Sequence, residues 1–139
     1  MSDHPIRERA LDERHLTIRV LAMPADTNPS GDIFGGWLMS QVDIAGSILA
    51  VQVAQGRVAT VAVHDFQFLK PVLVGDLVSC YAEVERRGKT SVRVKVDVYA
   101  ERERDPQSVD LVASASITYV AVGENSRPRS LPQSNNKKG

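Results

Sequence analysis

Apolar side chains fall at every second position near the start of the chain, at Leu16, Ile18, Val20 and Ala22. A period of two predicts a β-strand with one buried face. The following stretch PADTNPSGD, residues 24–32, is rich in proline, asparagine, aspartate and glycine. We therefore expect a loop after this strand.

A long apolar run covers residues 33–54 and contains a single charge, Asp43. Its apolar side chains recur at helical spacing, in the series Leu38, Val42, Ala45 and Leu49 and in the adjoining stripe Ile44, Ile48 and Val51. The pattern predicts a helix that is apolar around most of its circumference. A membrane span is disfavoured, because a carboxylate near its middle would cost about 3 kcal/mol. We expect the curved face of a sheet to enclose this helix.

Strand-like patterns fill most of the remaining chain. They cover residues 57–69, 77–86, 92–99 and 110–122, and residues 87–89 form a hairpin-type turn. One strand, one long helix and four more strands predict an α+β fold, in which an antiparallel sheet of about five strands wraps around the helix. A single sheet over one helix leaves a sheet face or edge uncovered, so we expect copies of the chain to associate.

The distribution of polar residues predicts the limits of the folded unit. Residues 1–13 are polar and mixed in charge, which indicates a loosely ordered N-terminal arm. Residues 123–139 have almost no apolar side chain beyond Leu131, so we expect a disordered tail. One domain of residues 14–122 remains, which suits a chain of 139 residues.

Charge and cysteine content narrow the classes of partner. Seventeen basic and seventeen acidic residues leave no net charge, which argues against nucleic acid and against an anionic membrane surface. Cys80 is the one cysteine, so it cannot form an internal disulfide. The residues around it in the sequence include no cluster of metal ligands, which argues against a zinc site. The charged N-terminus lacks the apolar core of a signal peptide, so we expect a cytoplasmic protein.

Three segments in order carry a specific resemblance to a known family. They are MPADTNPSGDIFGGWLMSQVD (residues 23–43), GRVATVAVHDFQFLKPVLVGD (residues 56–76) and RRGKTSVRVKVDV (residues 86–98). Together they resemble the YciA-type acyl-CoA thioester hydrolases of the hotdog superfamily. Ser30 departs from the family, whose members often carry asparagine or histidine there, and His64 and Asp65 stand where relatives vary.

The resemblance implies the hotdog fold, in agreement with the helix-in-a-sheet arrangement that the periodicity predicts. It implies hydrolysis of acyl-CoA to a free carboxylic acid and CoA, with no metal or redox cofactor, CoA being part of the substrate. It also implies a homohexamer built as a trimer of dimers, with the active site between two subunits. A hotdog dehydratase and an acyl-CoA sensor are the alternatives. Dehydratases usually pair a histidine with the acid, and a sensor needs no base, so Asp43 favours the hydrolase.

Gly35 and Gly36 fall at the first turn of the predicted helix, where backbone N–H groups have no intrahelical acceptor. We expect these amides, with that of Trp37, to stabilise the oxyanion of a thioester under attack. The alternative is that the glycines only let helix and sheet pack closely. Asp43 lies two turns further, and the resemblance places it at the family's catalytic acid residue. Its expected role is general base or nucleophile, and the alternative is a polar anchor at a subunit interface.

Asn28 matches the family position whose amide orients water or the substrate carbonyl. The resemblance implies that it faces Asp43 of the other chain, whereas a turn-forming asparagine is the alternative. Thr60 is a weaker candidate and Ser47 weaker still, because such hydroxyls more often satisfy backbone groups. We assign no role to His64, which lies beside aromatic residues of a predicted strand.

Coenzyme A carries a diphosphate and a 3′-phosphate, so a protein without net charge needs a local basic cluster to bind it. The predicted turn offers three cations and two hydroxyls in the run Arg86, Arg87, Gly88, Lys89, Thr90 and Ser91. Arg57 and Lys70 are further candidates. A solvated hairpin tip is the alternative interpretation.

Overall fold

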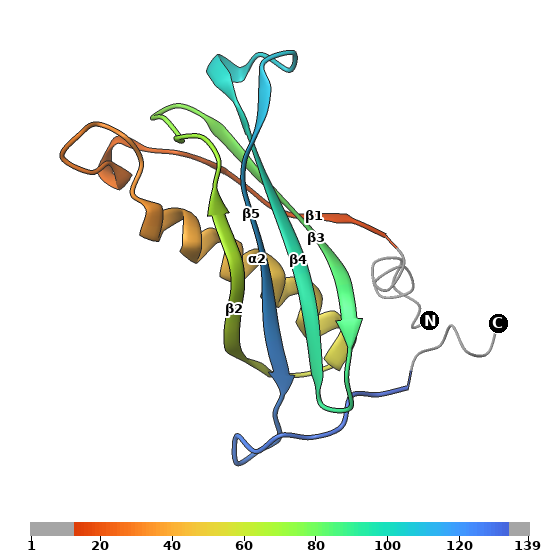
Figure 1. Cartoon of the computed structure of the whole chain (residues 1–139). Helices are drawn as coiled ribbons and strands as arrows, with labels where there is room; N and C mark the ends of the chain where they lie inside the picture. The colour runs from red at the N-terminus through yellow and green to blue at the C-terminus, as the bar shows by residue number, and fades with distance from the viewer. Residues whose placement is uncertain (1–12, 134–139) are drawn as a thin grey trace.

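The structure, a computed structural model, describes residues 13–133 (Figure 1). Its elements in chain order are β1 (His15–Leu21), the 3₁₀ turn η1 (Pro24–Asp26), α2 (Gly35–Ala54), β2 (Val58–Phe68), β3 (Leu77–Arg87), β4 (Ser91–Glu101), the 3₁₀ turn η2 (Arg102–Arg104) and β5 (Val109–Ala121). The predicted helix and strands are all present. Most of the predicted N-terminal arm, and the end of the predicted tail from residue 134, lie outside the described residues.

One antiparallel sheet holds the strands in the order β1-β3-β4-β5-β2. The sheet curves around α2, which crosses its concave face (Figure 1). The predicted α+β arrangement of five strands around one long helix is therefore confirmed. The edge strand β2 pairs with β5 in antiparallel fashion. The beginning of β2 therefore lies beside the end of β5.

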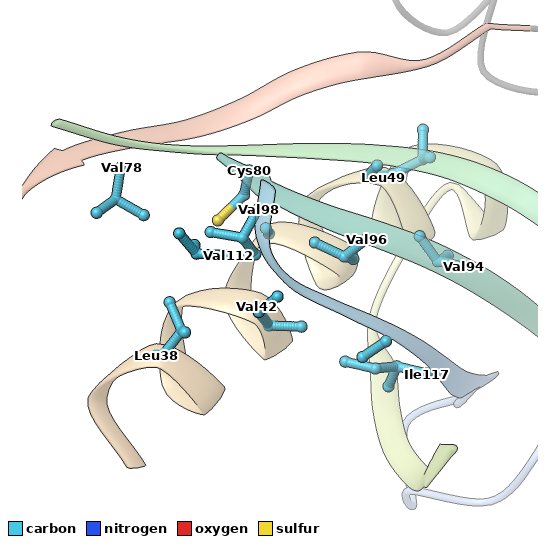
Figure 2. Packing of buried hydrophobic residues seen from close by; sticks show 14 of the residues in the cluster. Leu38, Val42, Leu49, Val78, Cys80, Val94, Val96, Val98, Val112 and Ile117 are labelled. Carbon is cyan, nitrogen blue, oxygen red and sulfur yellow. The ribbon is translucent and has the colours of Figure 1, made fainter. Parts of the chain in front are cut away.

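Valine side chains of the central strand form the middle of the hydrophobic core. Four of them, at alternate positions of β4, are fully buried: Val92, Val94, Val96 and Val98. They belong to one cluster with the helix residues Leu38, Val42 and Leu49 (Figure 2). Burial of each such side chain contributes about 1.5–3 kcal/mol, so the cluster fixes the helix across the sheet.

The sheet covers only one side of α2. The helix buries eight residues, whereas Ile44, Ile48 and Val51 are 49%, 39% and 40% exposed. A single chain therefore does not enclose the helix as expected, because one sheet layer reaches only one of its sides. The helix α2 is long and apolar enough to cross a membrane. The core helix of a soluble protein meets the same criterion of length and composition. The edge strand β2 exposes further apolar surface at Val61 and Val63.

Residues 123–133 pack against the sheet, where the sequence predicts a disordered tail. Val122 forms a β-bridge with Pro128, and the Leu131 N–H donates to the Lys89 carbonyl at 2.9 Å. The Leu131 side chain also packs on the core. The prediction is wrong for this part of the tail because it weighs apolar burial alone, whereas backbone hydrogen bonds and arginine contacts hold the segment.

Arg129 attaches this C-terminal segment to the end of the helix. Its Nη2 donates to the Ala54 carbonyl at 3.0 Å, and its Nε donates to the Val122 carbonyl at 3.1 Å. The last carbonyls of a helix have no intrahelical partner and lie at the negative end of its dipole, so a guanidinium there is stabilising. Gly56 passes beside this group, and a Cβ at that position would overlap Nη2.

Replacing Arg129 by alanine is expected to lower the free energy of unfolding by about 2 kcal/mol, because hydrogen bonds from a charged donor to two part-buried carbonyls are lost. Urea titration at fixed protein concentration measures the change. Arg127→Ala is the matched control, since the Arg127 side chain is exposed and has no partner within residues 13–133. An equal loss of stability in both variants would contradict the role of Arg129.

Candidate functional site

Asp43 lies midway along α2 and is partly buried. The Thr60 hydroxyl of β2 donates to Asp43 Oδ1 at 2.8 Å. The Tyr119 hydroxyl of β5 donates to the main-chain carbonyl of Asp43 at 2.7 Å and lies 3.2 Å from Oδ1. Thr60 and Tyr119 are direct partners in the β2–β5 ladder, so the strand register brings both hydroxyls to one point of the helix. These contacts lower the cost of burying the only charge in α2.

The two oxygens of the Asp43 carboxylate differ in their surroundings. Oδ1 has both hydroxyl contacts, whereas no described residue donates a hydrogen bond to Oδ2. A carboxylate oxygen without a protein partner can take a proton from water or attack a carbonyl carbon. One oxygen of Asp43 is therefore held in place while the other is free for chemistry.

Tyr119 is the residue of this site that sequence reasoning missed. It is fully buried, and burial together with the Asp43 carboxylate raises the pKa of its hydroxyl far above the usual value for tyrosine. The hydroxyl therefore keeps its proton and acts as a donor. A signal was available, because Tyr119 stands in a strand whose neighbouring residues Ala115 and Ala121 are small, and a buried tyrosine hydroxyl needs a partner.

The helix α2 begins at Gly35 without a side-chain cap. A backbone bond runs from the Leu38 N–H to the Phe34 carbonyl at 3.3 Å, whereas the N–H groups of Gly35, Gly36 and Trp37 have no acceptor within the described chain. A Cβ on Gly36 would meet open space. Free amides at the positive end of a helix dipole can hold an oxyanion, as expected for these glycines.

Asn28 lies in the loop before the helix. Its Oδ1 accepts the N–H of Ser30 at 2.9 Å and that of Asp32 at 3.1 Å, so the turn-forming role is present. Its Nδ2 has no acceptor in the part of the chain that the structure describes. The side chain can therefore shape the loop through its oxygen and donate to a ligand through its nitrogen.

A cavity of about 310 Å³ adjoins the start of α2, and its lining includes Asn28, Gly35, Phe34, Phe68 and Lys70. Neither Asp43 nor Thr60 lines this cavity. The helix also separates them, because Asp43 follows Gly36 by two turns, about 10 Å along the axis. One chain thus divides the predicted catalytic residues into an amide group (Asn28, Gly35 and Gly36) and a carboxylate group (Asp43 and Thr60).

With the exception of Lys70, the residues predicted to bind phosphate gather at one end of the molecule. The start of β2, the β3–β4 hairpin and the C-terminal segment meet there, at the lower end of Figure 1. Arg87 Nη2 donates to the Pro132 carbonyl, and burial lowers the pKa of its guanidinium. Arg57 contacts the Gly123 carbonyl and the Ser126 hydroxyl, each at 3.4 Å. Both arginines therefore hold the C-terminal segment.

The tip of the hairpin carries free positive charge. Arg86 and Lys89 are exposed, and neither side chain has a partner within residues 13–133. The Gly88 N–H donates to the Ser91 carbonyl at 2.8 Å, and a Cβ on Gly88 would lie 2.7 Å from Ser91 Oγ. The Thr90 carbonyl accepts an N–H from β5 at 2.9 Å. Gly88, Thr90 and Ser91 thus build the turn that presents Lys89, close to Arg86 near the end of β3.

The lesser candidates have other contacts. The Ser47 hydroxyl donates to a carbonyl of its own helix at 2.7 Å, as expected. Lys70 lies beyond the far end of β2, where its Nζ is 3.2 Å from Asp110 Oδ1, so it does not join the basic hairpin. His64 Nε2 lies 3.0 Å from the Thr118 hydroxyl, and neither residue contacts Asp43.

Cys80 is buried in the core, and burial raises the pKa of its thiol to about 12. The thiol therefore stays protonated at neutral pH and is no nucleophile. Among residues 13–133, no group of three or more histidine, cysteine, aspartate or glutamate side chains could hold a metal ion.

Comparison with known proteins identifies the family of this chain. A model of the thioesterase superfamily matches residues 30–107. The chain is 50% identical to the acyl-CoA thioester hydrolase YciA of Escherichia coli K12 over 119 residues, which cover 84% of this chain and 90% of that protein.

Two solved structures extend the similarity. A hexameric broad-specificity acyl-coenzyme A thioesterase superposes with a TM-score of 0.83 at 45% identity, covering 89% of this chain and 91% of that chain. An acyl-CoA hydrolase from Staphylococcus aureus, in complex with butyryl coenzyme A, coenzyme A and coenzyme A disulfide, has a TM-score of 0.77 at 29% identity, covering 86% and 71%. Variants of that hydrolase with alanine in place of an asparagine, a threonine or an aspartate have also been solved.

Proposed function

The chain belongs to the thioesterase superfamily and is an acyl-CoA thioester hydrolase with the hotdog fold, and we propose that Asp43 carries its chemistry. The reaction converts an acyl-CoA thioester and water to a free carboxylic acid and CoA. The proposal depends on one observation, that Asp43 is fixed through Oδ1 while Oδ2 is free. A sensor needs no such base, and a dehydratase usually adds a histidine, which is not among the contacts of Asp43.

The proposed reaction uses the carboxylate group and the amide group together. The thioester oxygen accepts hydrogen bonds from the amides of Gly35 and Gly36, which stabilise its developing charge. In the general-base route, Asp43 Oδ2 takes a proton from water, hydroxide adds to the carbonyl carbon, and the tetrahedral intermediate expels the CoA thiolate, which takes the proton from Asp43. In the nucleophilic route, Oδ2 attacks the carbonyl carbon and the C–S bond breaks, which gives a mixed anhydride and the CoA thiolate. Water then hydrolyses the anhydride to the free acid and the Asp43 carboxylate, and the proton released goes to the thiolate. Neither route includes a metal or an organic cofactor.

The amide group of one subunit and the carboxylate group of another complete the proposed site. Within one chain, Asn28 lines a cavity that Asp43 does not reach. Ile44 and Ile48, on the same helix as Asp43, are exposed and apolar, which supports burial against a second copy. The similar broad-specificity thioesterase is hexameric. We propose that this protein is likewise a homo-oligomer, a trimer of dimers in which the dimer is the active unit.

Lys89 and Arg86 are proposed to bind the phosphates of CoA. Both are exposed cations: Arg86 lies near the end of β3, and Lys89 lies in the turn that Gly88, Thr90 and Ser91 hold in shape. Arg57 and Arg87 support this corner through the C-terminal segment, so their substitution would disturb both structure and binding. Lys89 therefore provides the cleaner test.

Asp43→Asn is expected to lower kcat by about 10²- to 10⁴-fold, the usual contribution of a general base. Release of free thiol from butyryl-CoA, followed with a thiol reagent, measures turnover. Asp97→Asn is the matched control, because Asp97 accepts a hydrogen bond from the Ser114 hydroxyl at 2.9 Å but does not contact the site. Turnover near the wild-type rate in Asp43→Asn would refute the role of Asp43.

Mixed oligomers of Asn28→Ala and Asp43→Asn chains test the shared site. Each variant alone has only defective sites, whereas a mixed dimer keeps one intact site if Asn28 and Asp43 come from different subunits. Random pairing is then expected to restore about a quarter of the wild-type activity. Thr60→Ala mixed with Asp43→Asn is the control, because these residues contact each other within one chain and no intact site forms. If the mixture of Asn28→Ala and Asp43→Asn chains recovers no activity, Asn28 and Asp43 of each site belong to one chain, and the shared site is refuted.

Lys89→Ala is expected to raise KM for acyl-CoA several-fold, with little change in kcat, because it removes a contact to a part of the substrate that does not react. The difference from the wild type should shrink as salt screens the charge. Steady-state kinetics at low and high ionic strength measures both effects. Lys95→Ala, an exposed lysine within β4, is the control. If KM does not change, the hairpin is not part of the phosphate site.

A further inference from the structure

We infer that Tyr119 is a positioning residue for the hydrolysis: its hydroxyl bridges the main chain and the side chain of Asp43 and fixes the rotamer that leaves Oδ2 free. The inference rests on the role proposed for Asp43 and adds a residue outside the predicted set. Gly46 belongs to the same arrangement, because it leaves the space that the Tyr119 ring occupies.

The hydroxyl of Tyr119 contacts two acceptors of a single residue. It lies 2.7 Å from the Asp43 main-chain oxygen and 3.2 Å from Oδ1. Rotation about the Cα–Cβ bond of Asp43 would move Oδ1 away from Tyr119, while the main-chain oxygen would stay in place. The contact therefore favours one side-chain rotamer. Thr60 also holds Oδ1, but Thr60 is exposed on the edge strand, where water competes for the same oxygen.

Packing alone does not explain the Tyr119 hydroxyl. The residue is fully buried in the core cluster, where a phenylalanine ring would fill the same space without a polar atom. A buried hydroxyl needs a hydrogen-bond partner, and both partners of this one belong to Asp43. The oxygen of Tyr119 is therefore best explained by what it does to Asp43.

Gly46 follows Asp43 by one helical turn and faces the Tyr119 ring. A Cβ at Gly46 would lie 3.1 Å from Cζ and 3.2 Å from Cε2 of the ring, and closer still to the hydroxyl oxygen. Glycine is unfavourable inside a helix relative to alanine, so a buried helical glycine needs a reason. Here the reason is that a side chain at Gly46 would overlap the Tyr119 ring.

Tyr119→Phe tests the inference, because it removes one oxygen and keeps the ring. We expect kcat for butyryl-CoA to fall about 10-fold, since a hydrogen bond to a charged group has an effect of this size. KM and the thermal midpoint should change little, because the ring still fills the core and does not contact substrate. Tyr99→Phe is the matched control: its hydroxyl accepts a bond from Arg14 at 2.9 Å, away from Asp43, and its loss should leave kcat unchanged.

The outcomes separate this inference from the proposed function. Wild-type kcat in Tyr119→Phe, with Asp43→Asn inactive, would overturn the positioning role alone. A lower thermal midpoint with an unchanged kcat per folded protein would also overturn it, because that result describes a purely structural residue. Wild-type turnover in Asp43→Asn would instead overturn the proposed function.

Gly46→Ala gives a second measurement of the same contact. Its methyl group would displace the hydroxyl from Asp43, so kcat should fall in the otherwise native protein. In the Tyr119→Phe background the same change should have a smaller effect on kcat, because the displaced oxygen is already absent. Equal fold-losses in the two backgrounds would overturn the inference.

Discussion

A carboxylate in the middle of an apolar helix is costly to bury unless hydrogen-bond donors reach it, and much of this structure meets that requirement for Asp43. The donors come from two strands, β2 and β5, that are far apart in sequence but adjacent in the sheet. Thr60 and Tyr119 sit opposite each other in that ladder, so sheet register decides whether Asp43 is partnered. The strand order therefore determines which donors reach Asp43, and with them the chemistry of the site.

The fold divides its tasks between two faces of α2. One face packs on the valines of β4 and fixes the helix, while the other exposes an apolar stripe that the sheet does not cover. The start of the same helix presents free amides beside Asn28. A helix held firmly on one side can thus offer its remaining surface to a second subunit and to substrate.

Local patterns predict the elements of this protein, whereas contacts between distant residues escape them. Alternating valines predict β4, apolar spacing predicts α2, and the lone charge in an apolar run singles out Asp43. Tyr119 meets Asp43 across 76 residues of sequence, through a ladder whose register shifts near Thr60. The local pattern can therefore single out the tyrosine, but it does not indicate its partner. Arg129 likewise reaches the Ala54 carbonyl across 75 residues, and composition alone therefore predicts a disordered tail.

The strand that completes the site, β5, follows α2 and the other strands in the sequence, and this order affects how the enzyme is made. A ribosome releases α2 and Thr60 well before it translates Tyr119, and β2 has no neighbouring strand to pair with until β5 emerges. The nascent chain therefore carries its carboxylate with an incomplete set of partners until β5 has been made. A product truncated before β5 would lack the ladder that builds the site, so activity arises only after β5 has been translated.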